Sequence, residues 1–200
     1  MAVTVELRVM ELLCSRLCHE LISPVGAINN GIELMGEEDP AFVKQAMELI
    51  GNSARTAGNR LNFYRFAYGS GRAGSGREAA LALLDGGKVR CVWDDAVNAQ
   101  QVEWQRLACN MVVLVAEALP RGGSVQVSAV VGKRGLAVKG TGDAVNLTSE
   151  VRGALAGTVA VSELTARSVH AYYTARLAEA LNVKLALGEP AAGSVSLTAS

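Results

Sequence analysis

Residues 13–35 read LCSRLCHELISPVGAINNGIELM, and they end a stretch from Val3 that contains one proline and no run of turn residues. Apolar side chains recur along this stretch at steps of three and four residues, which is the period of an α-helix. These side chains are Leu7, Met10, Cys14, Leu17, Leu21, Val25, Ile28, Ile32 and Met35. At a rise of about 1.5 Å per residue the helix would be roughly 50 Å long. A helix of that length needs a partner helix along its apolar side.

The next segment, GEEDP at residues 36–40, predicts a tight turn into a second helix. Gly36 can end the first helix, Asp39 can cap the second, and Pro40 suits its first turn. The second helix should run to about Tyr68 and pack antiparallel on the first. Its expected apolar face comprises Val43, Met47, Ile50, Ala54, Ala57, Leu61, Tyr64 and Tyr68. Two helices alone bury too little apolar surface to be stable, so we expect a homodimer that forms a four-helix bundle.

The remainder of the chain has a different pattern. Residues 69–76, GSGRAGSG, predict a linker between a helical domain at residues 1–68 and a second domain at residues 77–200. In the second domain, helical and strand patterns alternate. We expect helices at 78–84, 101–119, 147–156 and 163–181, strands at 88–93, 124–131, 135–139, 183–187 and 194–198, and a hairpin turn at 132–134. The predicted fold class is α+β, with a helical hairpin followed by an α/β sandwich whose sheet is mostly antiparallel.

Composition excludes several function classes. Half of the 200 residues are hydrophobic and 19% are charged, as in folded domains. With 19 basic and 19 acidic residues the net charge is zero, which leaves no basic stripe for nucleic acid. No apolar run is long enough to span a membrane, and the charged N-terminal region does not resemble a signal peptide, so a cytoplasmic protein is expected. The Cys14, Cys18 and His19 cluster lacks a second ligand pair, so no metal site is expected.

The residues that carry chemistry are Cys18-His19-Glu20-Leu21-Ile22-Ser23-Pro24. A neutral imidazole is nucleophilic near neutral pH and forms a phosphoramidate that is labile enough to pass its phosphoryl group onward. The adjacent Glu20 carboxylate can hydrogen-bond the ring and fix its tautomer. His19 and Glu20 are therefore the predicted catalytic residues.

One face of the first helix carries small and polar side chains. Ser15, His19, Ser23, Gly26 and Asn30 follow one another at steps of 4, 4, 3 and 4. Bulky side chains there would keep another protein away from the imidazole. The candidate partner-binding residues are Arg16, Ser23, Gly26 and Asn30, although Arg16 could equally be a solvated charge. Pro24 removes a backbone hydrogen bond and should loosen the helix one turn after His19.

The box formed by His19, Glu20, Leu21, Ser23 and Pro24 resembles the phospho-accepting box of sensor histidine kinases. The longer run at residues 13–35 is similar to the ChpT family of alphaproteobacterial histidine phosphotransferases, and the similarity extends over nearly the whole chain. This resemblance implies a dimeric helical hairpin and a second domain like the ATPase domain of a histidine kinase. It also implies a hybrid histidine kinase receiver domain as phosphoryl donor and cell-cycle response regulators as acceptors.

The second domain departs from the nucleotide-binding pattern of such kinases. The helix asparagine of such kinases has a counterpart in Asn110, but the second Asn-Ala pair expected one or two turns later is replaced by Glu117-Ala118. Residues 138–142 keep the glycines of the adenine loop without its aspartate. Residues 162–181, where a glycine-rich loop should cover the phosphates, contain no glycine. We therefore expect no bound nucleotide, cofactor or metal, with the Mg²⁺ for transfer held by the partner receiver domains.

A histidine without a nucleotide site cannot phosphorylate itself. The sequence thus predicts a phosphorelay histidine phosphotransferase in which His19 takes a phosphoryl group from a receiver-domain aspartate and passes it to response-regulator receiver domains. Three alternatives stay open: an autokinase with a divergent nucleotide site, a response-regulator phosphatase, and a non-enzymatic dimeric adaptor whose histidine is incidental.

Overall fold

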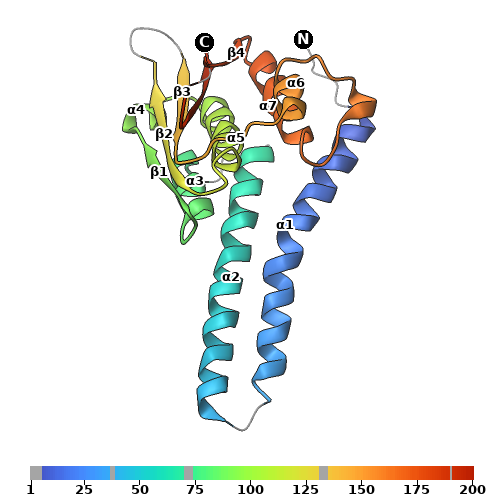
Figure 1. Cartoon of the computed structure of the whole chain (residues 1–200), viewed down its shortest axis with the longest axis vertical. Coiled ribbons are helices and arrows are strands. Elements are labelled where there is room, and N and C mark those ends of the chain that lie inside the picture. Colours follow the sequence, from blue (N-terminus) through green and yellow to red (C-terminus); the bar gives the residue numbers. More distant parts are fainter. Residues whose placement is uncertain (1–5, 37–38, 70–73, 131–134, 190) are drawn as a thin grey trace.

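The computed structural model describes residues 6–36, 39–69, 74–130, 135–189 and 191–200. Two long antiparallel helices, α1 (Leu7–Leu34) and α2 (Pro40–Tyr68), carry an α/β domain at one end (Figure 1). The predicted start of α2 is confirmed, since Asp39 Oδ1 accepts a hydrogen bond from the Ala41 N–H at 2.8 Å and Pro40 is the first helical residue. The predicted helical hairpin is therefore present.

A glycine allows the two helices to approach closely. Gly31 is buried, and a Cβ atom placed on it would lie 2.6 Å from Ile50 Cγ1 and 3.2 Å from the Ala46 oxygen. Ala46 itself is fully buried. Small residues on both helices thus bring the two backbones together below the α/β domain.

The predicted apolar faces of the hairpin are only partly right. Many of the large side chains expected between α1 and α2 are exposed instead, among them Met10, Val25, Ile32, Met47 and Leu61. The side chains buried on the two helices are Val9, Leu12, Pro24, Gly31, Ala46, Ser53, Ala57, Phe63, Phe66 and Ala67. Because close approach along the small residues rotates the larger apolar stripe outward, much of that stripe has no cover within the chain.

The α/β domain contains one five-stranded sheet with the order β1-β2-β3-β5-β4. Its strands are β1 (Val89–Trp93), β2 (Gly123–Ala129), β3 (Leu136–Thr141), β4 (Leu185–Leu187) and β5 (Ser194–Ala199). Only the β1–β2 pair is parallel, so the sheet is mostly antiparallel, as predicted. The main helices of the domain are α3 (Gly76–Leu84), α5 (Val102–Glu117), α6 (Ser149–Leu155) and α7 (Val169–Ala180). The middle of α5 is buried between the sheet and the other helices, and this burial makes it the centre of the core.

The domain differs from the sequence prediction in three local features. Two short helices were not expected, α4 (Asp95–Asn98) and η1 (Val161–Glu163). The helix predicted over 163–181 is α7 alone and begins only at Val169. Just before it, Ser168 Oγ accepts a hydrogen bond from the Thr165 N–H at 3.0 Å and Thr165 Oγ1 accepts one from the Arg167 N–H at 3.2 Å, the kind of side-chain bonds that cap the start of a helix.

Two predicted connections involve residues that the structure does not describe. The predicted hairpin turn at 132–134 lies wholly outside the described residues, and of the predicted linker, residues 70–73 lie outside them. Gly76, the last residue of that predicted linker, is already the first residue of α3. A Cβ atom on Gly76 would lie 3.0 Å from Gln105 Cβ, so the start of α3 packs closely against α5.

A buried histidine joins the hairpin to the α/β domain. The Tyr68 hydroxyl at the end of α2 lies 2.5 Å from His170 Nδ1, and His170 Nε2 lies 3.1 Å from the Asn110 carbonyl oxygen. A carbonyl can only accept, so Nε2 carries the hydrogen and Nδ1 accepts from Tyr68. Complete burial, with a smaller contribution from the charge of Arg16, lowers the pKa of His170 to about 3. His170 is therefore a neutral structural link between three helices.

Candidate functional site

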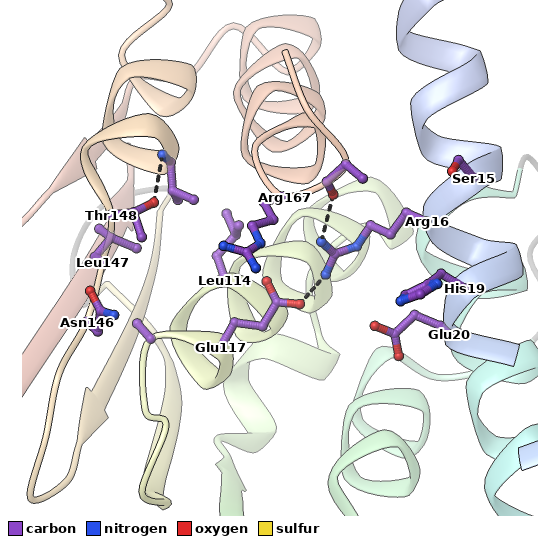
Figure 2. Close-up of a pocket in the computed structure, with 13 residues that line it drawn as sticks. Ser15, Arg16, His19, Glu20, Leu114, Glu117, Asn146, Leu147, Thr148 and Arg167 are labelled. Atoms are coloured by element: carbon purple, nitrogen blue, oxygen red, sulfur yellow. Dashed lines mark hydrogen bonds and ion pairs between the residues drawn. The ribbon is translucent and has the colours of Figure 1, made fainter. Parts of the chain in front are cut away.

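A cleft of about 500 Å³ opens between α1 and the α/β domain (Figure 2). Its walls are formed by Ser15, Arg16, His19 and Glu20 of α1 and by Leu114, Glu117, Ala118, Asn146, Leu147, Thr148, Val151, Ala166 and Arg167. The His19 ring points from α1 toward this space, and Glu117 faces it from the opposite wall (Figure 2). The predicted phospho-accepting histidine thus lies at the mouth of a cleft shared by both parts of the molecule.

His19 is exposed on α1. Within the described part of the chain, neither ring nitrogen has a hydrogen-bond partner. The predicted hydrogen bond in which the imidazole N–H donates to the Glu20 carboxylate is not formed; this carboxylate lies 3.2 Å from Arg60 Nη1 instead. The ring of His19 is therefore open to another molecule, and the catalytic role of Glu20 stays a prediction.

Arg16, one turn before His19, has its side chain only 10% exposed, so it is not the solvated charge considered above. Its guanidinium forms an ion pair with Glu117 at the end of α5 and donates a hydrogen bond to the Ala166 oxygen at 3.3 Å (Figure 2). Burial by itself would lower the pKa of Arg16, but the Glu117 carboxylate together with Tyr68 and Tyr64 outweighs burial, and the pKa is raised. Arg16 therefore ties α1 to two segments of the α/β domain, and its predicted partner contact stays a prediction.

Glu117 is the acidic member of this pair. Its side chain retains 47% exposure, yet its carboxylate lies within the walls of the cleft. Partial loss of water raises the pKa of Glu117, and the Arg16 charge opposes that increase. The carboxylate thus gives the cleft wall opposite His19 a negative group that is partly neutralised by arginine.

The predicted stripe of small and polar residues is present on α1. Ser15, His19, Ser23 and Asn30 are exposed and Gly26 is half-buried. A Cβ atom on Gly26 would meet nothing within 4 Å, in contrast to the crowded Gly31 of the same helix. The packing of the described chain therefore does not require glycine at position 26, and binding of a partner by this face stays a prediction.

Comparison with known proteins decides the family. The family description "Histidine phosphotransferase C-terminal domain" matches residues 76–193. The chain belongs to this family. The protein phosphotransferase ChpT of Brucella abortus (strain 2308) is 33% identical over 194 residues, which cover 88% of each chain. A solved structure of a bacterial phosphotransferase shares 30% identity and superposes with a TM-score of 0.81, covering 100% of this chain and 98% of the other.

These similarities confirm the ChpT-like family and the α+β fold with its N-terminal hairpin and C-terminal sheet. Membership in the histidine phosphotransferases supports phosphotransferase activity and a histidine phosphotransferase role in a phosphorelay. None of the described helices is long and apolar enough to cross a membrane.

In this ChpT-like domain, two residues that match parts of the kinase nucleotide-binding pattern, Asn110 and Gly140, make packing contacts inside the protein. Asn110 is buried, and its Nδ2 donates hydrogen bonds to the Ala67 oxygen at 3.2 Å and the Arg106 oxygen at 2.8 Å. A Cβ atom on Gly140 would lie 2.6 Å from Val115 Cγ1, so this glycine lets β3 lie against α5. Neither residue lines the cleft. Among the described residues, no three His, Cys, Asp or Glu side chains gather as a metal site.

Sequence reasoning missed Arg60 and underrated Glu117 among the residues around the candidate site. Both residues contact the helix that carries His19, and both come from segments remote from it in the chain. A signal existed for Glu117, because it replaces the asparagine that the resemblance to histidine kinases leads one to expect at this position. Nothing local marked Arg60 among the arginines of α2.

Proposed function

We propose that the chain is a phosphorelay intermediate that carries a phosphoryl group on His19. The observation that supports the proposal best is the position of His19, exposed on α1 within a face of small and polar residues and at the mouth of an open cleft. The donor is a receiver-domain aspartyl phosphate of a hybrid histidine kinase. The acceptors are the receiver domains of response regulators.

In the first transfer, one nitrogen of the neutral imidazole attacks phosphorus. The N–P bond forms while the P–O bond to the donor aspartate breaks, and the aspartate leaves as a carboxylate. The ring gains positive charge in this step, and the neighbouring Glu20 carboxylate stabilises that charge. In the second transfer, the acceptor aspartate attacks phosphorus, the N–P bond breaks and His19 becomes neutral again.

In this proposal the partner receiver domains supply the metal ion for the reaction. Receiver domains hold the Mg²⁺ that neutralises the phosphoryl oxygens, so transfer requires Mg²⁺ only through them. The proposal includes no ATP binding, because Asn110 faces the end of α2 and Gly140 is occupied with packing against α5. The cleft and the α/β domain enlarge the surface on which a receiver can dock beside His19.

The proposal includes a homodimer. Large exposed apolar side chains concentrate on the hairpin: Leu7, Met10, Ile22, Val25, Ile32, Leu34, Met35, Phe42, Met47, Leu49 and Leu61. So many exposed apolar side chains are unfavourable in water, and a second copy of the hairpin would cover part of them in a four-helix bundle.

The test measures label transfer to His19. Purified receiver domain with a radiolabelled aspartyl phosphate is mixed with wild-type protein and with His19→Ala, and parallel reactions contain labelled ATP alone. We expect label on the wild type from the receiver only, and a loss of at least about a thousandfold in His19→Ala because the nucleophile is gone.

The other outcomes identify the alternatives. Label taken directly from ATP would make the chain an autokinase. Loss of receiver phosphate without any transient phosphohistidine would favour a response-regulator phosphatase. If the wild type neither takes label nor removes it from any receiver tested, the adaptor interpretation replaces the relay.

A further inference from the structure

Arg60 of α2 contacts α1 immediately after His19. Its Nη1 donates a hydrogen bond to the backbone oxygen of Glu20, and the same nitrogen lies 3.2 Å from Glu20 Oε2. A guanidinium Nη carries two N–H bonds, so it can serve both oxygens. The side chains of Arg60 and Glu20 are 29% and 33% exposed, which places the contact partly out of water.

The backbone oxygen that Arg60 contacts is the one left without a helical partner by Pro24. In an α-helix, the carbonyl of Glu20 would accept the N–H of the residue four positions later. Pro24 has no N–H, and a proline ring crowds the carbonyl four residues before it. Nevertheless α1 continues through Pro24 to Leu34, and Pro24 is buried. The carbonyl can therefore take a donor from outside the helix, and Arg60 is in place to be that donor.

We infer that Arg60 is a positioning residue for phosphotransfer: it supplies the hydrogen bond that Pro24 removes and thereby holds the turn of α1 that carries His19. This inference rests on the proposed function. The Glu20 carbonyl belongs to the peptide that directly follows the His19–Glu20 pair, so its movement also moves the imidazole. Transfer between histidine and aspartate needs an in-line approach, and a displacement of about 1 Å can reduce such a rate by roughly a hundredfold.

The contact with the Glu20 carboxylate offers a competing explanation. In that case Arg60 would act by neutralising Glu20, and Pro24 would be irrelevant to its effect. The two explanations differ in which residue is energetically coupled to Arg60, and a double-mutant cycle measures that coupling.

The experiment compares wild type, Arg60→Met, Pro24→Ala and the double variant in label transfer from the receiver domain. Pro24→Ala restores the missing N–H, so the Glu20 carbonyl no longer needs Arg60. We expect Arg60→Met to slow transfer about tenfold in the wild-type background and less than about twofold in the Pro24→Ala background. Arg60→Lys keeps a donor and should recover part of the loss.

Two matched variants complete the design. Arg65→Met removes an exposed arginine from the same helix and should transfer at the wild-type rate. Glu20→Gln, combined with Arg60→Met, tests the competing explanation. Coupling of Arg60 to Glu20 but not to Pro24 overturns the inference, and so does an equal slowing by Arg60→Met in both proline backgrounds.

A second readout separates this inference from the proposed function. The same four proteins are unfolded in urea, and the midpoint shifts are compared. We expect Arg60→Met to lower the midpoint at least about twice as much with proline at position 24 as with alanine there. If the wild type accepts no phosphoryl group, the proposed function fails while this cycle still measures the contact. Equal midpoint shifts in the two backgrounds contradict the role of Arg60 itself.

Discussion

Gly26 adds no bulk to the exposed face of α1 around His19, and the chain around it leaves room for a side chain. Gly26→Leu should therefore leave the fold intact, or stabilise it by about 0.5 kcal/mol because glycine is unfavourable in helices. The leucine would, however, stand between His19 and an approaching receiver domain. We expect receiver-to-histidine transfer to fall at least about tenfold, measured by label transfer alongside thermal unfolding.

Gly26→Ala serves as the control for this substitution, because alanine also favours the helix but adds only one methyl group. It should transfer at close to the wild-type rate. Wild-type transfer by Gly26→Leu would show that receivers do not approach His19 across this face.

His170 makes stability depend on pH. Its pKa is about 3 in the folded chain, whereas an unfolded histidine titrates near 6.5. Below pH 6.5 the unfolded state binds a proton at this histidine and the folded state does not. The free energy of unfolding therefore falls as the pH falls. Between pH 6.5 and pH 5 this residue alone should remove roughly 1.5 kcal/mol from the free energy of unfolding.

His170→Gln isolates this effect in urea unfolding at several pH values. The glutamine amide can accept from Tyr68 and donate to the Asn110 oxygen as the histidine does, but it does not titrate. The difference in stability between the two proteins should shrink as the pH falls from 6.5 to 5. A difference that is constant across this range would contradict a neutral buried His170.

At the scale of elements, α1 and α5 are joined by the Arg16–Glu117 ion pair. Glu117→Gln leaves the Arg16 charge with little compensation, and the Arg16 side chain is only 10% exposed. Loss of one partner from a fully buried pair costs about 3–5 kcal/mol, whereas exposed pairs contribute less than about 1 kcal/mol. Since Glu117 is half exposed, we expect a loss of about 1–2 kcal/mol, measured by urea unfolding.

The double variant Arg16→Met with Glu117→Gln tests whether the pair itself is responsible. Removal of both charges should cost less than the sum of the two single losses. Additive losses would mean that the two residues stabilise the interface independently.

At the scale of the whole molecule, exposed apolar side chains of the hairpin predict association. Met47, Ala54 and Leu61 are exposed and repeat every seven residues on α2, the spacing of a helical seam. Met47→Glu combined with Leu61→Glu would place carboxylates in that seam of a four-helix bundle. We expect the mass measured by light scattering to fall from dimer to monomer, with dimer affinity reduced at least about a hundredfold.

Leu81→Glu alters an exposed leucine of α3, outside the hairpin, and should leave the mass unchanged. A wild-type protein that is monomeric at micromolar concentration would contradict the proposed bundle.

Local sequence signals predicted a large part of the fold and the centre of the site. The helix period, the Asp39 cap and Pro40 at the first position of α2 act between residues a few positions apart, and the hairpin follows from them. The position of His19 and the stripe around it follow from the same periodicity. For α7 the predicted start at residue 163 was too early, because side-chain hydrogen bonds at Thr165 and Ser168 cap the chain after that residue.

The sequence by itself determined that His19 stands on a long helix followed by an α/β domain, because helix period, caps and motif spacing are local properties. Only the tertiary structure decided which apolar residues are covered, since the close approach at Gly31 depends on α2. The tertiary structure alone also decided that Arg16 contacts Glu117, 101 residues away, and that Arg60 contacts the Glu20 carbonyl, 40 residues away. Such pairs depend on how finished elements pack, and no periodicity along a single element encodes that arrangement.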